Sequence, residues 1–278
     1  MSTRELLHTL NREDARVPAA VAREIPAIAR AVEAAVRSFR RGGRLIYIGA
    51  GTSGRLGVLD ASEIPPTFGA SPGLVQGVIA GGRSALARAI EGAEDSVALG
   101  KRDMAAKKIT RQDVVVGLTA SGSTPYVLGA LRYAKAKGVL TVAVTCNRRS
   151  EVARAARIVI APQVGAEAIA GSTRMKAGTA QKLVLNMLST AVMVRLGHVY
   201  DNWMISVAKT NSKLRRRAER ILAEATGAGV AAVRRALRQA RHDQRVALVM
   251  LKRRVDADEA RERLRRVGGN LRRALGES

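Results

Sequence analysis

The chain has 278 residues, of which 47% are hydrophobic and 26% are charged, and its formal net charge is +25 at pH 7. This length allows one large or two small domains with a real core, and no uninterrupted apolar run reaches membrane-spanning length. The charge raises the question of nucleic-acid binding, but aromatic residues make up only 3% and the basic residues alternate with acids in helical, alanine-rich segments. We therefore expect neither a nucleic-acid partner nor a membrane partner.

The N-terminus and the cysteine content bear on the compartment. The first residues are polar and lack the hydrophobic region of a secretory signal. Cys146 is the one cysteine, so an internal disulfide framework is excluded, and its place at the end of an apolar strand predicts a buried, inert thiol. We expect a cytoplasmic protein.

Residues 1–41 read as helical. Residues 11–14 resemble a helix entry, and residues 17–39 carry apolar side chains at helical spacing. This segment is too short for a DNA-binding domain with a linker, which argues against a transcription regulator.

Residues 42–165 alternate short apolar strands with helices. Strands are predicted near 44–49, 74–80, 113–119, 139–145 and 157–161. Such alternation predicts an α/β fold with a five-stranded parallel sheet sandwiched by helices. Ligands of such sheets bind at the carboxyl ends of the strands.

Two loops rich in glycine and hydroxyl groups follow two of these strands. The first contains Gly51, Thr52 and Ser53; the second reads Ser121, Gly122, Ser123 and Thr124. The glycine spacing of the first loop also fits a dinucleotide fingerprint, but the second predicted strand ends in Gly-Gly-Arg-Ser without the acid that the ribose requires. The missing acid weakens the dinucleotide interpretation, but an arginine there could suit the 2′-phosphate of NADP, so an NADP site is not excluded. Two hydroxyl loops at one sheet edge favour a small phosphate held from two sides.

Three glutamates lie close to these loops in the sequence. Residues 84–95 have a helical pattern with Ser84 as N-cap, which would place Glu91 and Glu94 on one face. Gly92 between them is unfavourable in an exposed helix, and close approach of another backbone would explain it. Glu63 precedes two prolines that we expect to end the helix of the first loop.

The C-terminal half reads as helical. Residues 171–182 begin with small residues that permit tight packing or a ligand, and an apolar helix follows through Leu196, its 183–194 part being a core or dimer helix. Residues 198–225 continue as helix with Lys213 in the middle. Short alanine- and arginine-rich helices follow. We expect a helical segment at 1–41, a sheet domain with dimerisation helices at 42–225, and a small helical bundle at 226–278.

At these residues the chain resembles the N-acetylmuramic acid 6-phosphate etherases, a branch of the sugar isomerase (SIS) domain proteins. The runs that match best are residues 43–66, 81–95, 113–127, 171–190, 210–214 and 246–271, and the resemblance extends over nearly the whole chain. The run Gly-Ala-Gly-Thr-Ser-Gly-Arg-Leu, followed by Asp-Ala-Ser-Glu, is highly specific.

The resemblance implies a cofactor-independent carbon–oxygen lyase without a metal. Such an enzyme cleaves the C3 D-lactyl ether of N-acetylmuramic acid 6-phosphate, by elimination and hydration, to N-acetylglucosamine 6-phosphate and D-lactate in cell-wall recycling. The family's catalytic glutamates align with Glu63 and Glu94, which we take as acid and base, although the sequence does not order these roles. A homodimer is implied, with Lys213 reaching the partner's site. Gly51, Thr52, Ser53, Glu91 and residues 121–124 would bind the sugar phosphate.

The chain departs from the family pattern at several positions. Ser123 stands where the family usually has an arginine, Ile64 where it has a cysteine, and Asp201 and Ser206 where it has glycine and aspartate. Ser123 puts the phosphate affinity in question. A non-catalytic regulator that binds sugar phosphates, such as the longer glucokinase regulatory protein, is the alternative function. It would need the phosphate loops but not both glutamates.

Overall fold

The computed structural model describes residues 1–206 and 212–277. The chain divides into two compact units, Met1–Ser62 with Pro72–Ser189 and Glu63–Ser71 with Thr190–Ser278. The second unit begins well before residue 226, and residues 1–41 belong to the first. Independent folding of the expected bundle at 226–278 stays a prediction.

The first unit contains the predicted five-stranded parallel sheet. Its strands are β1 (Leu45–Gly49), β2 (Val75–Ile79), β3 (Val114–Leu118), β4 (Leu140–Val144) and β5 (Ile158–Ile160). Each lies inside its predicted range, because buried β-branched runs ended by turn residues leave little choice of boundary. The strand order is β2-β1-β3-β4-β5, so β1 and β3 are neighbours although β2 lies between them in the sequence.

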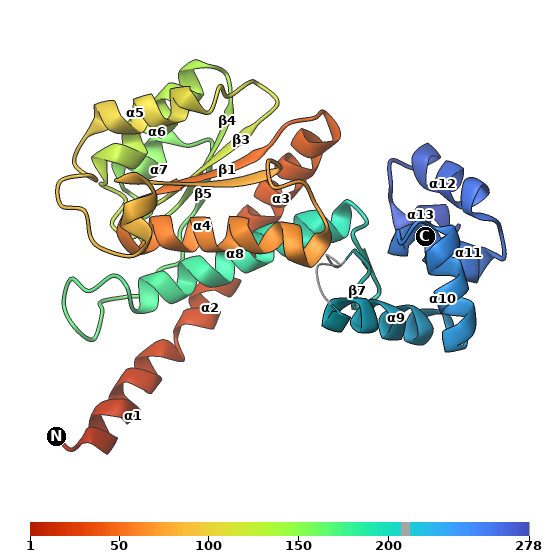
Figure 1. The fold of residues 1–278 in the computed structure, drawn as a ribbon. Helices are drawn as coiled ribbons and strands as arrows, with labels where there is room; N and C mark the ends of the chain where they lie inside the picture. Colours follow the sequence, from red (N-terminus) through yellow and green to blue (C-terminus); the bar gives the residue numbers. More distant parts are fainter. Residues whose placement is uncertain (207–211, 278) are drawn as a thin grey trace. The chain divides into compact units, whose positions relative to one another are not determined.

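Helices cover both faces of the sheet (Figure 1). Helices α5 (Val97–Ala106), α6 (Pro125–Ala136) and α7 (Glu151–Ala155) lie on one face, and α4 (Gly51–Phe68) and α8 (Lys176–Arg195) lie on the other. Side chains alternate accordingly: Ile46 and Ile48 belong to the same core cluster as Leu131 of α6. Tyr47 points to the other face, where Gly57 of α4 allows close packing.

The N-terminal segment is helical, as expected for residues 1–41. Its helices are α1 (Thr3–Asp14), α2 (Val17–Ala22) and α3 (Ile25–Arg40). The prediction of a helix entry at residues 11–14 is wrong, because these residues end α1. The helix starts after Ser2, whose hydroxyl and backbone N–H form a capping box with Glu5.

The second unit is mostly helical. It contains α9 (Ser212–Thr226), α10 (Val230–Gln239), α11 (Gln244–Arg253), α12 (Ala257–Arg266) and α13 (Leu271–Ala274). Leu222, Val233, Leu248 and Leu271 share its core. The predicted continuous helix over 198–225 is wrong: β6 (Val199–Tyr200) and β7 (Trp203–Met204) form an antiparallel hairpin, because Asp201 adopts a left-handed conformation that turns the chain back.

Within residues 1–206 and 212–277, no helix is both long and apolar enough to cross a membrane.

Candidate active site

The two hydroxyl-bearing loops are neighbours at the carboxyl edge of the sheet. β1 pairs with β3 in parallel, and Gly49 lies opposite Leu118, so the loops that follow these strands leave the sheet side by side. The strand order reverses between β1 and β3, since β2 lies on one side of β1 and β4 on the other side of β3. Such a reversal opens a crevice at the carboxyl ends of doubly wound sheets. The prediction that both loops lie at the carboxyl edge of the sheet is confirmed, and the structure further shows that the two loops follow neighbouring strands.

The first loop is a tight turn from β1 into α4. Gly51 has φ +51, a left-handed conformation that favours glycine. A Cβ at Gly49 would lie 2.8 Å from the backbone nitrogen of Gly54, and one at Gly54 would lie 2.7 Å from the Gly49 oxygen. The strand and the helix therefore touch through bare backbone. This turn places the start of α4, where unpaired N–H groups favour an anion, at the edge of the sheet.

A glutamine from α8 holds one hydroxyl of this turn. Buried Ser53 donates from Oγ to Oε1 of buried Gln181 at 2.8 Å, whereas Thr52 is half-buried. Sequence reasoning missed Gln181, because 128 residues separate the two side chains and no spacing signals the contact. Ser53 therefore anchors the turn to α8.

The second loop carries its own hydrogen-bond network. The hydroxyls of Ser121 and Ser123 lie 3.0 Å apart, and those of Thr119 and Thr124 lie 2.7 Å apart. The N–H of Gly122 donates to Thr119 Oγ1 at 3.2 Å. Ser121, Ser123 and Thr124 remain exposed or half-buried, so their oxygens are accessible at the mouth of the loop.

The predicted helix over 84–95 is wrong. A short 3₁₀ helix, η1 (Gly82–Leu86), is followed by turns, and the next helix, α5, begins after Ser96, whose side chain caps it. Gly92 has φ +67, and a Cβ added there would meet nothing within 4 Å, so a left-handed turn explains the glycine and close backbone approach does not. Glu91 and Glu94 thus lie on a loop.

Backbone contacts fix this loop on both sides. The N–H of Tyr126, in the first turn of α6, donates to the Glu94 carbonyl oxygen at 3.0 Å, which brings Glu94 beside the second hydroxyl loop. Arg55 of α4 donates from Nε to the carbonyls of Ala85 at 3.0 Å and Leu86 at 3.2 Å. Arg55 is the second residue that sequence reasoning left without a role.

These elements enclose a cavity of about 250 Å³. Gly51 and Arg55 line it from α4, and Glu91, Glu94 and Asp95 line it from the loop after η1. Carboxylates beside a helix start that favours anions suit a ligand that carries both a phosphate and an exchangeable proton.

Glu63 is exposed in the C-terminal half of α4 and belongs to the second unit. The prediction that Pro65 and Pro66 end this helix is wrong, because α4 continues to Phe68. Burial of Ile64 and Phe68, one turn apart, stabilises the last turn against the loss of two amide donors. Lys213 is the second residue of α9, not a mid-helix residue, and its side chain lies outside the described part of the chain.

The thiol of Cys146 is half-buried after β4. Burial, together with the negative charge of Glu167, raises the pKa of Cys146 to about 11, so the thiol stays protonated at neutral pH. Among the described residues, no group of three or more His, Cys, Asp or Glu side chains could hold a metal ion.

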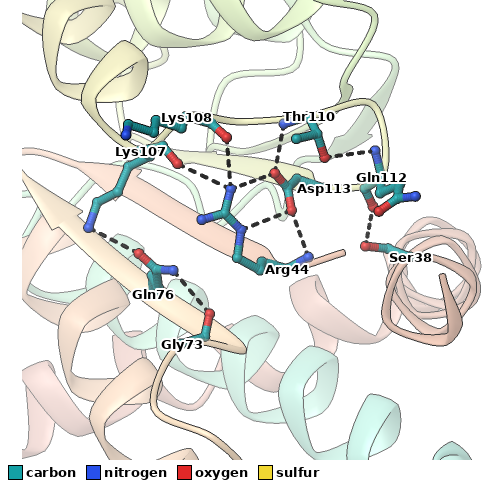
Figure 2. Close-up of polar contacts among 9 residues, drawn as sticks. All are labelled: Ser38, Arg44, Gly73, Gln76, Lys107, Lys108, Thr110, Gln112 and Asp113. Carbon is teal, nitrogen blue, oxygen red and sulfur yellow. Dashed lines mark hydrogen bonds and ion pairs between the residues drawn. The ribbon is translucent and has the colours of Figure 1, made fainter. Parts of the chain in front are cut away.

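An ion pair at the opposite edge of the sheet holds β1 and β3 in register (Figure 2). Arg44, just before β1, donates from Nη2 to Asp113 Oδ2 at 2.8 Å and from Nε to Oδ1 at 3.1 Å. Asp113, just before β3, also accepts the backbone N–H groups of Arg44 and Thr110, both at 2.8 Å. Burial opposes ionisation of this carboxyl, but the hydrogen bonds outweigh it and lower the pKa of Asp113. The contact holds the starts of β1 and β3 level, consistent with the register that places Gly49 opposite Leu118 at the other edge.

Comparisons with known proteins identify this arrangement. A SIS domain model matches residues 95–191, and a model of the glucokinase regulatory protein N-terminal SIS domain matches residues 27–135. The solved phosphoheptose isomerase of Francisella tularensis is 18% identical with a TM-score of 0.54, covering 70% of this chain and 100% of that one, and shares the fold.

Curated relatives match over almost the full length. The N-acetylmuramic acid 6-phosphate etherase of Pectobacterium atrosepticum is 56% identical over 275 residues, covering 99% of this chain and 91% of the relative. The etherase of Yersinia pestis is also 56% identical, covering 99% of this chain and 93% of the relative. The chain belongs to the N-acetylmuramic acid 6-phosphate etherase family, built on a sugar isomerase-type sheet.

Proposed function

We propose that this protein is an N-acetylmuramic acid 6-phosphate etherase that releases D-lactate from the C3 ether and forms N-acetylglucosamine 6-phosphate. The observation that carries the proposal is 56% identity to etherases over 99% of the chain. The regulatory alternative has weaker support, because the glucokinase regulatory protein model matches only residues 27–135. We further propose that the enzyme is a cofactor-independent lyase of cell-wall sugar recycling in the cytoplasm.

The 6-phosphate of the substrate would sit between the two hydroxyl loops. Adjacency of β1 and β3 supports this, as do the accessible hydroxyls of Ser121, Ser123 and Thr124 and the start of α4 at Gly51. Ser53 would act mainly through its backbone N–H, since its hydroxyl already donates to Gln181. Ser123 would replace a charged phosphate contact with a neutral one, which weakens affinity.

Glu94 would act as the base. In the ring-opened sugar the C2 proton is α to the aldehyde, and a carboxylate can remove it. The C3–O bond then breaks, the electron pair goes to the lactate oxygen, and Glu63 as a carboxylic acid supplies its proton. Water adds to C3 of the unsaturated aldehyde while C2 regains a proton, which returns both carboxyl groups to their starting states. The anchored backbone of Glu94 in the cavity wall supports its role at C2.

Matched substitutions test this assignment. Glu94→Gln and Glu63→Gln keep the side-chain volume, and each is expected to reduce D-lactate release by about 10²- to 10⁴-fold. Glu151→Gln, at an exposed glutamate of α7, is the control and should leave the rate unchanged.

Deuterium exchange separates the two roles. Glu94→Gln should stop exchange of the C2 proton with D₂O, whereas Glu63→Gln should allow exchange while lactate release fails. Near-normal lactate release by Glu94→Gln would show that Glu94 is not the base.

We also propose a homodimer in which Lys213 reaches the partner's site. Helix α8 buries Val184, Leu185 and Leu188 within the chain, but Leu183 and Met187 are only half-buried and Val194 is 46% exposed. These last three share one helix face, which a second copy would cover. Light scattering should give twice the mass of the chain, and Met187→Glu should produce inactive monomers. An active, stable monomer of the unchanged chain would contradict the proposal.

A further inference from the structure

The second unit holds a cavity of about 350 Å³ that shares no residue with the cavity of Glu94. His198 and Ser206 flank the β6–β7 hairpin and line one part of it. Phe68 and Gly69, at the end of α4, also line it, as do the turn between α10 and α11 and the first residues of α11. This volume lies in the range of sites for small metabolites.

Arg245 is a largely enclosed cation in this cavity without an ion pair. Its Nη2 donates to the Gly269 carbonyl at 2.6 Å, but its Nε has no hydrogen-bond partner among the described residues, and none of their carboxylates pairs with it. The nearby Asp243 caps α11 instead, accepting the backbone N–H groups of Arg245 and Val246. Burial lowers the pKa of Arg245, partly opposed by the charge of Asp243. A buried charge of this kind is costly unless a counterion approaches.

Two further polar groups line the cavity beside Arg245, namely the Ser206 hydroxyl and the His198 imidazole. Ser206 Oγ is enclosed and has no hydrogen-bond partner in the part of the chain that the structure describes. The ring of His198 is oriented by a 2.9 Å hydrogen bond between Nδ1 and the Phe68 carbonyl oxygen. Burial and the charge of Arg245 lower the pKa of His198, and the Phe68 contact opposes them. An anion would accept hydrogen bonds from Arg245 and Ser206 and offset the guanidinium charge. Its negative charge would also favour protonation of His198, whose Nε2 could then donate to it while Nδ1 stays bonded to Phe68.

The rim adds positive charge. Arg241 and His242 are exposed and line the cavity with φ values of +51 and +63. Consecutive left-handed residues other than glycine are uncommon. Hydrogen bonds from His242 N to Leu237 O at 2.7 Å and from Asp243 N to Ala240 O at 3.0 Å hold the turn. The cavity is therefore entered past two basic side chains, and among the described residues that line it Asp243 is the one acid.

We propose that this cavity binds the phosphate group of a small phosphorylated metabolite, with Arg245 as the counterion and His198 and Ser206 as hydrogen-bonding partners. A dianion matches the convergence of a guanidinium, an imidazole and a hydroxyl better than a monoanion does. The proposal is independent of the proposed etherase activity, because the two cavities share no residue.

The chain has three histidines, and their positions allow phosphate binding in this cavity to be distinguished from binding elsewhere. His198 and His242 line the cavity, whereas His8 lies exposed on α1 in the first unit. In ¹H–¹⁵N spectra of the imidazoles of the full chain, inorganic phosphate should shift His198 and His242 saturably and leave His8 in place. Glucose 6-phosphate should compete for the same shifts.

Three variants complete the experiment. Arg245→Met should weaken binding by about 10- to 100-fold, as expected for lost hydrogen bonds to a charged group. This variant also loses the hydrogen bond to the Gly269 carbonyl, which could disturb the fold. Arg241→Met, at the exposed rim, is therefore the second variant, and it should lose less phosphate affinity than Arg245→Met. Arg235→Met, at an exposed arginine of α10 outside the cavity, is the control and should bind like the parent.

The proposal is overturned if phosphate leaves His198 unshifted, if the three histidines shift together without saturation, or if Arg241→Met and Arg245→Met bind as tightly as the parent. Failure of glucose 6-phosphate to compete would also overturn it, since the site would then exclude phosphorylated metabolites.

Discussion

Gly54→Ala should weaken both the fold and the candidate active site, because the first loop depends on direct contact between β1 and α4. An added Cβ would lie 2.7 Å from the Gly49 oxygen and 2.7 Å from Ile79 Cγ1. The Ile79 side chain can rotate, but the Gly49 oxygen accepts a hydrogen bond from Ala80 N at 3.0 Å and cannot withdraw. Overpacking of this kind costs about 1–3 kcal/mol, and the better helix propensity of alanine returns about 0.5–1 kcal/mol. We expect a net loss of about 1–2 kcal/mol in the free energy of unfolding.

Gly178→Ala is the matched control for this variant. Gly178 lies in the first turn of α8, near the same loop, and a Cβ there would meet Thr52 Cγ2 at 3.5 Å and the Thr173 oxygen at 3.6 Å, both ordinary contacts. Helix propensity alone then applies, so the variant should be unchanged or more stable by up to about 1 kcal/mol. Urea unfolding followed by far-UV circular dichroism measures both, and D-lactate release measures the site. Equal urea midpoints for the two variants, with unchanged activity, would refute the close-contact argument.

Two further predictions follow from the ion pair and the thiol. Asp113→Asn leaves Arg44 without its partner at a carboxyl that is 2% exposed, and should cost about 2–4 kcal/mol in urea unfolding. Because the folded pKa of Asp113 is lowered, its contribution is present above the unfolded pKa of about 4 and is lost as pH falls through the folded value, so the parent should lose more stability on acidification than the variant. Cys146, with a pKa of about 11, should react with iodoacetamide about 100-fold more slowly at neutral pH in the folded than in the urea-unfolded chain, by mass spectrometry; equal rates would contradict its burial.

The sheet was predictable because its signal is local. Val114–Leu118 is a fully buried run of apolar residues and glycine, and no other element accommodates five such residues between turn signals. The position of both hydroxyl loops at the carboxyl edge then follows from parallel strands alone. Their adjacency does not, because the sequence gives the order of the strands along the chain and not across the sheet. The contact of Ser53 with Gln181 was hidden for the same reason.

The segment that carries Glu91 and Glu94 shows why a helical pattern can mislead. Its alanines and its spacing fit a helix, but a helix must pair its own carbonyl oxygens with N–H groups one turn later. Here Arg55 Nε donates to the carbonyl oxygens of Ala85 and Leu86, and Arg55 Nη2 donates to the carbonyl oxygen of Arg88 at 3.3 Å. A charged side chain from α4 thus replaces hydrogen bonds that the segment would otherwise make within itself.

That replacement opens the site. Gly92, at φ +67, turns the chain where a helix would have continued, and Tyr126 N then binds the Glu94 carbonyl. Both glutamates line the cavity because the segment between η1 and α5 is held from outside, by α4 on one side and α6 on the other. The contacts that decide its conformation therefore come from residues distant in the sequence, 30 positions away for Arg55 and Ala85, where a reading of local periodicity does not reach.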